Sequence, residues 1–229
     1  MSSPTDPSSA QPAWRHKSPG EHRWPASLAV VLAIGLQLAL PERLGLQPKF
    51  LLPGLETALL AAIVIANPTR MESRHRGLRF GGLALIALMS LSNAVSAGLL
   101  IDQLLHSARA TGSPGTLLAN GAAIYVTNII AFGLWFWEFD RGGPVARAYA
   151  DKRHADFQFP QMINPDMAPE AWRPLFMDYL YVSFTNAAAF SPTDAMPLSR
   201  WAKALMLLQS SIALTTVALV IARVVNILK

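Results

Sequence analysis

Long apolar runs separated by short polar breaks constrain the fold of this chain more than any other feature of its sequence. Five runs are clear, and each approaches or exceeds the roughly 20 residues with which a helix crosses about 30 Å of hydrocarbon. No run shows the period-two alternation of barrel strands. We therefore expect an all-α, polytopic membrane bundle. The five runs cover about residues 25–40, 50–66, 80–105, 116–139 and 201–228.

Composition agrees with a chain that is solvated partly by lipid. Charged residues make up 14% of the 229 residues, whereas a soluble domain carries about 25%. The basic residues cluster in the breaks between runs, which is typical of membrane topology and not of a nucleic-acid surface. The expected partner is therefore the lipid bilayer, and no nucleic acid is expected. The absence of cysteine excludes disulfides, thiolate metal sites and cysteine nucleophiles.

The first 24 residues differ from the remainder of the chain. They are rich in Ser, Pro and charge and have no apolar period, which predicts a disordered tail at 1–24 and a helical membrane domain at 25–229. A signal peptide is the alternative for 26–40, with the basic residues of the tail as its charged region. The length of the tail and the missing cleavage site favour an uncleaved first membrane helix.

A sixth apolar stretch, LFMDYLYVSFTNAAAF at 175–190, is short. At about 1.5 Å per residue it reaches only some 24 Å, so it either crosses as a short helix or re-enters. With six crossings and a cytoplasmic N-terminus, 13 basic residues lie inside and 5 outside, while Arg223 lies within the last run. The positive-inside rule then favours six crossings with both termini cytoplasmic over a pore loop that enters from outside.

The longest polar connection, at 140–173, joins the fourth run to the short stretch. A connection of this length without clear secondary structure indicates a functional or interfacial role. We expect Phe157, Phe159 and Trp172 to rest in the headgroup layer, and the aromatic cluster at 135–137 to belong to an interfacial belt.

Three strings carry a resemblance to a known family. They are FWEFDRGGP at 136–144, DFQFPQM at 156–162 and DYLYVSFTNAAAFSPTDAMPLSRWAK at 178–203. Together they resemble the domain-of-unknown-function 1345 family of bacterial membrane proteins, while the first three runs match it only by hydropathy. The resemblance implies a multi-pass protein of the bacterial inner membrane, and it brings no activity or catalytic residues with it.

The third string is also distantly similar to the pore loop of potassium channels. Both filter glycines of that pattern are replaced, by Ser191 and Thr193, and Pro192 lacks an amide donor, so a carbonyl cage for potassium is not expected. Ser191 and Asp194 instead fit a capping box at a helix start, and a capped turn is the simpler interpretation. The matching positions are Tyr181, Ser183, Phe184, Thr185, Asp194 and Pro197.

Several polar residues within or beside the runs are candidates for a pathway. Asp178 is either functional or a local cap at the interface. Arg223 either pairs with Asp178 or snorkels to the headgroups, and Glu56 and Asp102 either line a path or are solvated near helix ends. Neutral polar residues such as Asn128 and Gln209 favour interhelical hydrogen bonds over a hydrophilic cavity. The candidate pathway set is Asp178, Thr185, Asn186, Ser191, Thr193, Asp194 and Arg223.

The sequence offers no motif for enzyme chemistry. The five histidines have no metal-ligand spacing, and no nucleotide-binding or hydrolase motif occurs, so no enzyme, cofactor or metal is expected. Two functions stay open. One is a channel-like or transporter-like pore, built by homo-oligomerisation around the last two runs. The other is a non-conducting scaffold or regulatory subunit that binds a partner through the 140–173 connection.

Overall fold

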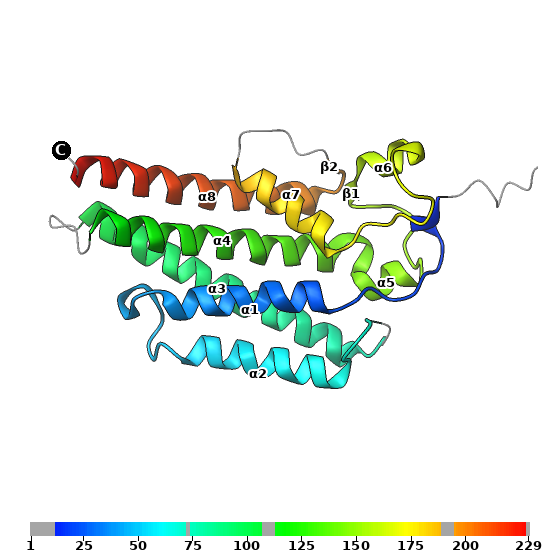
Figure 1. The fold of residues 1–229 in the computed structure, drawn as a ribbon, viewed down its shortest axis with the longest axis horizontal. Coiled ribbons are helices and arrows are strands. Elements are labelled where there is room, and N and C mark those ends of the chain that lie inside the picture. Colours follow the sequence, from blue (N-terminus) through cyan, green and yellow to red (C-terminus); the bar gives the residue numbers. More distant parts are fainter. Residues whose placement is uncertain (1–11, 72–73, 107–112, 189–194, 228–229) are drawn as a thin grey trace, which may run out of the picture.

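The computed structural model describes residues 12–71, 74–106, 113–188 and 195–227. It is an all-α bundle (Figure 1), as the apolar runs predict, and within the described residues the strands are one antiparallel pair, β1 (Phe157–Gln158) and β2 (Met196–Pro197). The helices are α1 (Trp24–Ala39), α2 (Leu51–Ala66), α3 (Arg76–His106), α4 (Pro114–Phe139), α5 (Pro144–Ala148), α6 (Pro160–Ile163), α7 (Phe176–Ala188) and α8 (Arg200–Ile227).

Helix length divides the apolar runs into two groups. The long helices α3, α4 and α8 are long and apolar enough to cross a membrane. The helices α1 and α2 are apolar but have 16 residues each. Helix ends follow the local sequence. The α4 helix starts where the Ser113 hydroxyl accepts a hydrogen bond from the Thr116 amide at 3.3 Å, and α2 stops at Asn67, just before a proline.

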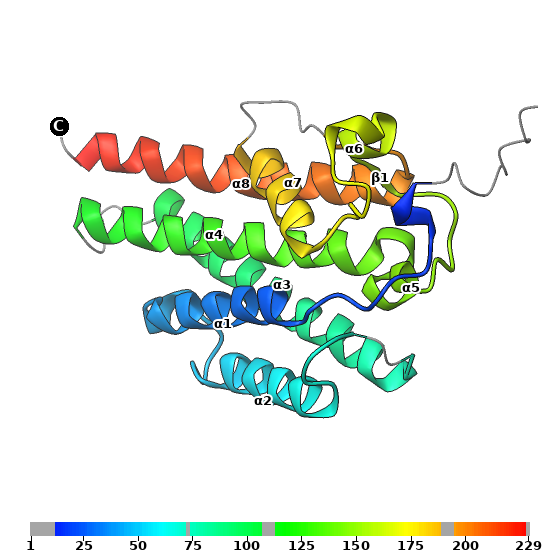
Figure 2. The same ribbon diagram turned by 45° about the vertical axis from the view of Figure 1, so that its right-hand side comes forward.

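The α4 helix is central, with α7 and α8 on one side and α1 and α3 on the other (Figures 1 and 2). We call the end where α1, α3 and α8 begin the basic end, and the opposite one the far end. Fourteen of the nineteen lysine and arginine residues belong to segments at the basic end. They are Arg15, Lys17, Arg23, Arg70, Arg74, Arg76, Arg79, Arg141, Arg147, Lys152, Arg153, Arg173, Arg200 and Lys203.

The path of α7 differs from the favoured prediction. The Phe157 ring lies 6.2 Å from Tyr179 in the first turn of α7 and 5.8 Å from Trp201 in the first turn of α8. Both helices therefore begin at the basic end, and the chain returns there through β2 (Figure 1). The expected crossing by 175–190 is wrong, and the alternative of a helix that returns to its own end describes this segment. The described chain consequently starts at the basic end and finishes at the far end.

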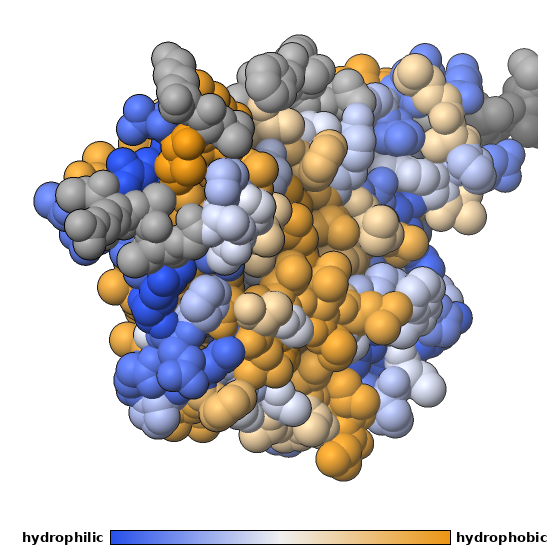
Figure 3. All heavy atoms as spheres, turned by 60° about the vertical axis from the view of Figure 1, so that its left-hand side comes forward, coloured by the Kyte–Doolittle hydropathy of each residue, from blue (hydrophilic) through white to orange (hydrophobic). Residues whose placement is uncertain are grey.

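Apolar side chains point outward along the long sides of the bundle. Leu28 on α1 is 59% exposed, Ile65 on α2 81% and Leu207 on α8 70%. In Figure 3, apolar side chains cover the middle of the face in view, and hydrophilic side chains gather toward both sides of it. An apolar band of this kind is typical of a surface that faces lipid and not water.

Two segments expected to be irregular are folded onto the bundle. The predicted tail is wrong for residues 12–23, where the Ser18 amide donates to the Ala148 carbonyl at 2.9 Å and Trp14 is buried. The 140–173 connection forms short helices and β1, and it buries Phe157 and Phe159 in the protein core, not in a headgroup layer. Residues 1–11 lie outside the described residues.

The crossing of α4 over α7 yields a first prediction. A Cβ added at Gly133 would lie 3.2 Å from the Leu180 Cα atom, so the two backbones must separate in Gly133→Ala. We expect a loss of about 1–3 kcal/mol in the free energy of unfolding, measured by denaturant titration of the purified protein in detergent. The control is Gly98→Ala on α3, where nothing lies within 4 Å. Equal stability of the two variants would contradict the packing described here.

Candidate binding cleft at the basic end

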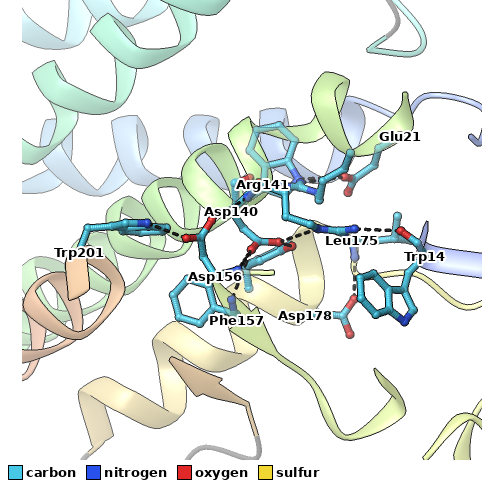
Figure 4. A network of polar contacts seen from close by, with 12 residues as sticks. Trp14, Glu21, Asp140, Arg141, Asp156, Phe157, Leu175, Asp178 and Trp201 are labelled. Carbon is cyan, nitrogen blue, oxygen red and sulfur yellow. Dashed lines mark hydrogen bonds and ion pairs between the residues drawn. The ribbon is translucent and has the colours of Figure 1, made fainter. Parts of the chain in front are cut away.

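The Asp140 carboxylate, directly after α4, is fully buried and holds the basic end together (Figure 4). Its Oδ2 accepts a hydrogen bond from the Tyr179 hydroxyl at 2.6 Å and one from Arg141 Nε at 3.4 Å. Its Oδ1 accepts from the backbone amides of Asp156 at 2.8 Å and Phe157 at 3.3 Å. Four donors thus converge on one carboxylate, which joins α4, the long connection and α7.

A second carboxylate, that of Asp156, extends this network to α8 and to the N-terminal segment (Figure 4). It accepts from the Arg141 amide and from Trp201 Nε1, both at 2.9 Å. Arg141 Nη1 in turn donates to the Trp14 carbonyl at 2.9 Å. Residues far apart in sequence therefore meet around two adjacent acids.

The turn after Asp140 explains the RGG sequence. Arg141, Gly142 and Gly143 have φ values of 51°, 86° and 98°, a region that non-glycine residues occupy rarely. A Cβ at Gly143 would lie 2.9 Å from the Glu138 carbonyl oxygen. Arg141 adopts this conformation because both its amide and its guanidinium are held by the two acids.

Arg147 and Glu21 form the other half of the network. Arg147 Nη1 donates to the carbonyls of Trp137 at 2.5 Å and Asp140 at 2.9 Å. The Glu21 carboxylate accepts from Trp137 Nε1 at 2.8 Å and from the Phe176 amide at 2.6 Å. Burial raises the pKa of Glu21 above its ordinary value, and the nearby Arg147 charge opposes that shift. Glu21 thus fastens the N-terminal segment to α4 and α7.

Beside this network a cleft of about 260 Å³ opens between α1, α2, α3 and α5. Near the basic end its lining is charged, whereas further along each helix it is apolar. Glu138 lies within it, mostly buried, with Oε1 4.0 Å from Arg79 Nε. Burial lowers the pKa of the Arg23 guanidinium below its ordinary value, and the nearby Glu138 carboxylate opposes that shift. The basic lining residues are Arg23, Arg74, His75, Arg76 and Arg79, and the apolar ones include Val30, Leu60, Ile63, Leu85, Ile86 and Leu134.

A further acid lies between α1, α2 and α3. Glu56 is fully buried, so the expectation of a solvated residue near a helix end is wrong for it. Gln37 Nε2 donates to Glu56 Oε2 at 3.1 Å, and the Ser92 hydroxyl donates to Gln37 Oε1 at 2.7 Å. Asp102, in contrast, is exposed and pairs with His106 at 2.9 Å.

The structure does not gather the predicted pathway residues into one site. The Asp178 carboxylate accepts from the Leu175 amide at 2.7 Å, so it caps the start of α7. The Thr185 hydroxyl donates to the Tyr181 carbonyl at 3.0 Å, within its own helix. Arg223 lies on α8 toward the far end, remote from Asp178 at the basic end. Ser191, Thr193 and Asp194 lie outside the described residues, as does the predicted capped turn.

Asn186 belongs to an interhelical contact. Its Nδ2 donates to the Met206 carbonyl at 2.9 Å and to Gln209 Oε1 at 2.8 Å. Gln209 Nε2 donates to the Ser183 hydroxyl at 2.7 Å. These polar groups satisfy one another between α7 and α8, which agrees with the interpretation of neutral polar residues as packing groups.

Sequence reasoning missed the acids and arginines that matter most. The sequence pattern places Asp140, Arg141 and Arg147 only within a polar connection and indicates no role for Glu138. The charged residues of FWEFDRGGP, next to a long apolar run, were the available indication. Comparison with protein-family models, curated proteins and solved structures finds no match to this chain. The cleft is therefore interpreted from its own chemistry.

Replacing Asp140 tests the network. In Asp140→Asn the amide nitrogen faces donors on whichever side it lies, because both carboxylate oxygens accept hydrogen bonds. We expect a loss of about 3–5 kcal/mol in the free energy of unfolding, measured by denaturant titration in detergent. Asp102→Asn, at an exposed acid, is the control and should change stability by at most about 0.5 kcal/mol. If both substitutions changed the free energy of unfolding only slightly, Asp140 would not be the centre of this network.

Proposed function

We propose that this chain is a transporter-like, multi-pass protein of the bacterial inner membrane that admits an anionic amphiphile into the cleft at its basic end. The anionic group is a phosphate or carboxylate, and the remainder of the molecule is apolar. The observation that carries the proposal is the cleft itself, with arginines near its opening and aliphatic side chains beyond them. Guanidinium groups bind phosphate and carboxylate with matched geometry.

Membrane placement follows from the exposed apolar sides and the charge bias. In this proposal α1, α2, α3, α4 and α8 cross the bilayer, and α7 re-enters from the face at which it starts. The basic end is cytoplasmic because it carries most of the lysine and arginine residues. The N-terminal segment is then cytoplasmic and α8 ends at the opposite face, which replaces the earlier expectation of two cytoplasmic termini.

The size and depth of the cleft favour a small ligand. Its volume of about 260 Å³ is slightly below the roughly 300–1,000 Å³ of ordinary ligand pockets. Its apolar lining residues lie further along the helices from the basic end than its arginines. A site that is accessible from one face is what alternating access requires of a transporter in one of its states.

The scaffold alternative has less support. It relies on the 140–173 connection as a partner-binding segment, but Phe157, Phe159 and Arg147 of that connection are buried against their own chain. The segment around Ser191 and Thr193, on which a potassium-channel-like pore would rest, lies outside the described residues. A homo-oligomer is compatible with the apolar sides of the bundle and is not needed to form the cleft.

Cysteine labelling tests both the cleft and its orientation, because the chain contains no cysteine. Ser27 lines the cleft, and its neighbour Leu28 lies at similar depth on the exposed apolar face. We expect an impermeant maleimide to label Ser27→Cys in inside-out membrane vesicles and to leave Leu28→Cys unlabelled. In right-side-out vesicles neither should react. Labelling of Ser27→Cys only from the outer face would reverse the orientation.

Ligand chemistry is tested by thermal unfolding of purified protein in nanodiscs. Phosphatidylglycerol should raise the unfolding temperature relative to phosphatidylcholine, and Arg79→Gln should remove most of that increase. Arg200→Gln, an exposed arginine of the same end outside the cleft, should retain it. A matching increase with inorganic phosphate in phosphatidylcholine would assign the site to a free anion. If Arg79→Gln and Arg200→Gln lost the same share of the increase in unfolding temperature, the lipid would be attracted by general charge and not by the cleft.

A further inference from the structure

Glu56 has an unused acceptor inside the bundle, in the second turn of α2 from the far end. Its side chain is 0% exposed, and its Oε1 has no hydrogen-bond partner among the described residues. Within the described part of the chain, its Oε2 accepts a hydrogen bond from the Gln37 amide alone. A carboxylate buried in this way is costly, because one neutral donor replaces a full hydration shell. This acid is unlike Asp140, whose two oxygens receive four hydrogen bonds.

The side chains that are hydrogen-bonded in line with Glu56 are neutral. The α1 helix contributes Gln37 and α3 contributes Ser92, which are both neutral. The connection before α2 contributes Lys49, which lines the same small cavity as those two residues. No ion pair within the described part of the chain involves Glu56.

The hydrogen bonds around Glu56 form a chain that can reverse. In one direction Ser92 donates to Gln37 Oε1, and Gln37 Nε2 donates to the carboxylate. When the carboxyl gains a proton, its O–H can donate to Gln37 Oε1 once the amide turns over, and Gln37 Nε2 then donates to the Ser92 oxygen. Both protonation states therefore keep two hydrogen bonds, so neither state leaves the amide unsatisfied.

The same groups do not suit a metal cation. A sodium or calcium ion requires several oxygen ligands, whereas Gln37 presents its nitrogen to the carboxylate. Within the described residues, no group of three or more His, Asp or Glu side chains could hold a metal. The proton is the one cation that a single carboxyl binds without further ligands.

A small cavity lies toward the far end, on the other side of Gln37 and Ser92. Gln37 and Ser92 line a cavity of about 20 Å³ together with Ser96 and Lys49, which is room for about one water molecule. In the other direction, Leu60 and Ile63 follow Glu56 at helical spacing on α2 and line the basic-end cleft. Glu56 thus lies on the α2 face that leads from the cleft toward the far end.

We propose that Glu56 is a reversible proton-binding site, at which one proton adds to the carboxylate and exchanges with solvent through the far-end cavity. The site is independent of the ligand that the cleft binds. It supplies the kind of group with which a transporter couples a solute to a proton gradient.

Infrared difference spectroscopy of the full chain in lipid vesicles tests this site. Between pH 5 and pH 9 we expect a carboxylic-acid C=O band that disappears as pH rises. The component of this band that belongs to Glu56 should be lost in Glu56→Gln and retained in Glu138→Gln, which replaces the acid of the cleft. Far-UV circular dichroism verifies that each variant remains helical, and Glu56→Asp, which keeps a carboxyl, should restore a titrating band if Glu56→Gln misfolds.

Gln37→Leu provides the second measurement. It removes the donor that stabilises the carboxylate, so the midpoint of the Glu56 band should rise by about one pH unit or more. A wild-type spectrum identical to that of Glu56→Gln across this pH range would overturn the proposal. A band that does not change with pH would do so as well, since it would mean a permanently neutral, structural acid. The infrared result does not depend on whether phosphatidylglycerol raises the unfolding temperature, so the proton site and the cleft ligand can fail separately.

Discussion

The hydrogen bonds to the buried Asp140 carboxylate are the interaction on which the rest of the basic end depends. They fix the direction in which the chain leaves α4, the position of β1 and the first turn of α7. In a low-dielectric interior such a network is strong when complete and costly when one member is missing. The adjacent Arg141 and Asp156 complete it, and through Trp14 and Trp201 they attach the N-terminal segment and α8.

The position of the cleft depends on this network, because the turn after Asp140 places α5. Because the RGG turn folds back against the carbonyl of Glu138, α5 stands beside α4. These two helices line one part of the cleft, and α1, α2 and α3 line the rest. The two kinds of buried acid then have separate tasks. Asp140 accepts four hydrogen bonds and is structural, whereas Glu56 has an acceptor without a donor among the described residues, and the side chains hydrogen-bonded in line with it are neutral. The contrast lies in the number of donors and not in the depth of burial.

Local pattern predicted the helices well, because each apolar run is long and ends at polar or proline residues. It failed where a segment is held by distant partners. Residues 12–23 have no apolar period, yet Glu21 binds the amide of Phe176, and no pattern in either segment indicates that contact. The count for six crossings assumes that 175–190 crosses, and it therefore includes Arg200 among the five basic residues outside. The resemblance to the domain-of-unknown-function 1345 family stays a prediction.

The bond between Glu21 and Phe176 also sets an order of events during synthesis. Its two ends are 155 positions apart, so the N-terminal segment emerges from the ribosome long before its partner exists. The helices α1, α2, α3 and α4 must already be made when the contact forms. Closure of the basic end is therefore a late step of biogenesis, and a chain truncated before α7 would leave residues 12–23 available to chaperones and proteases.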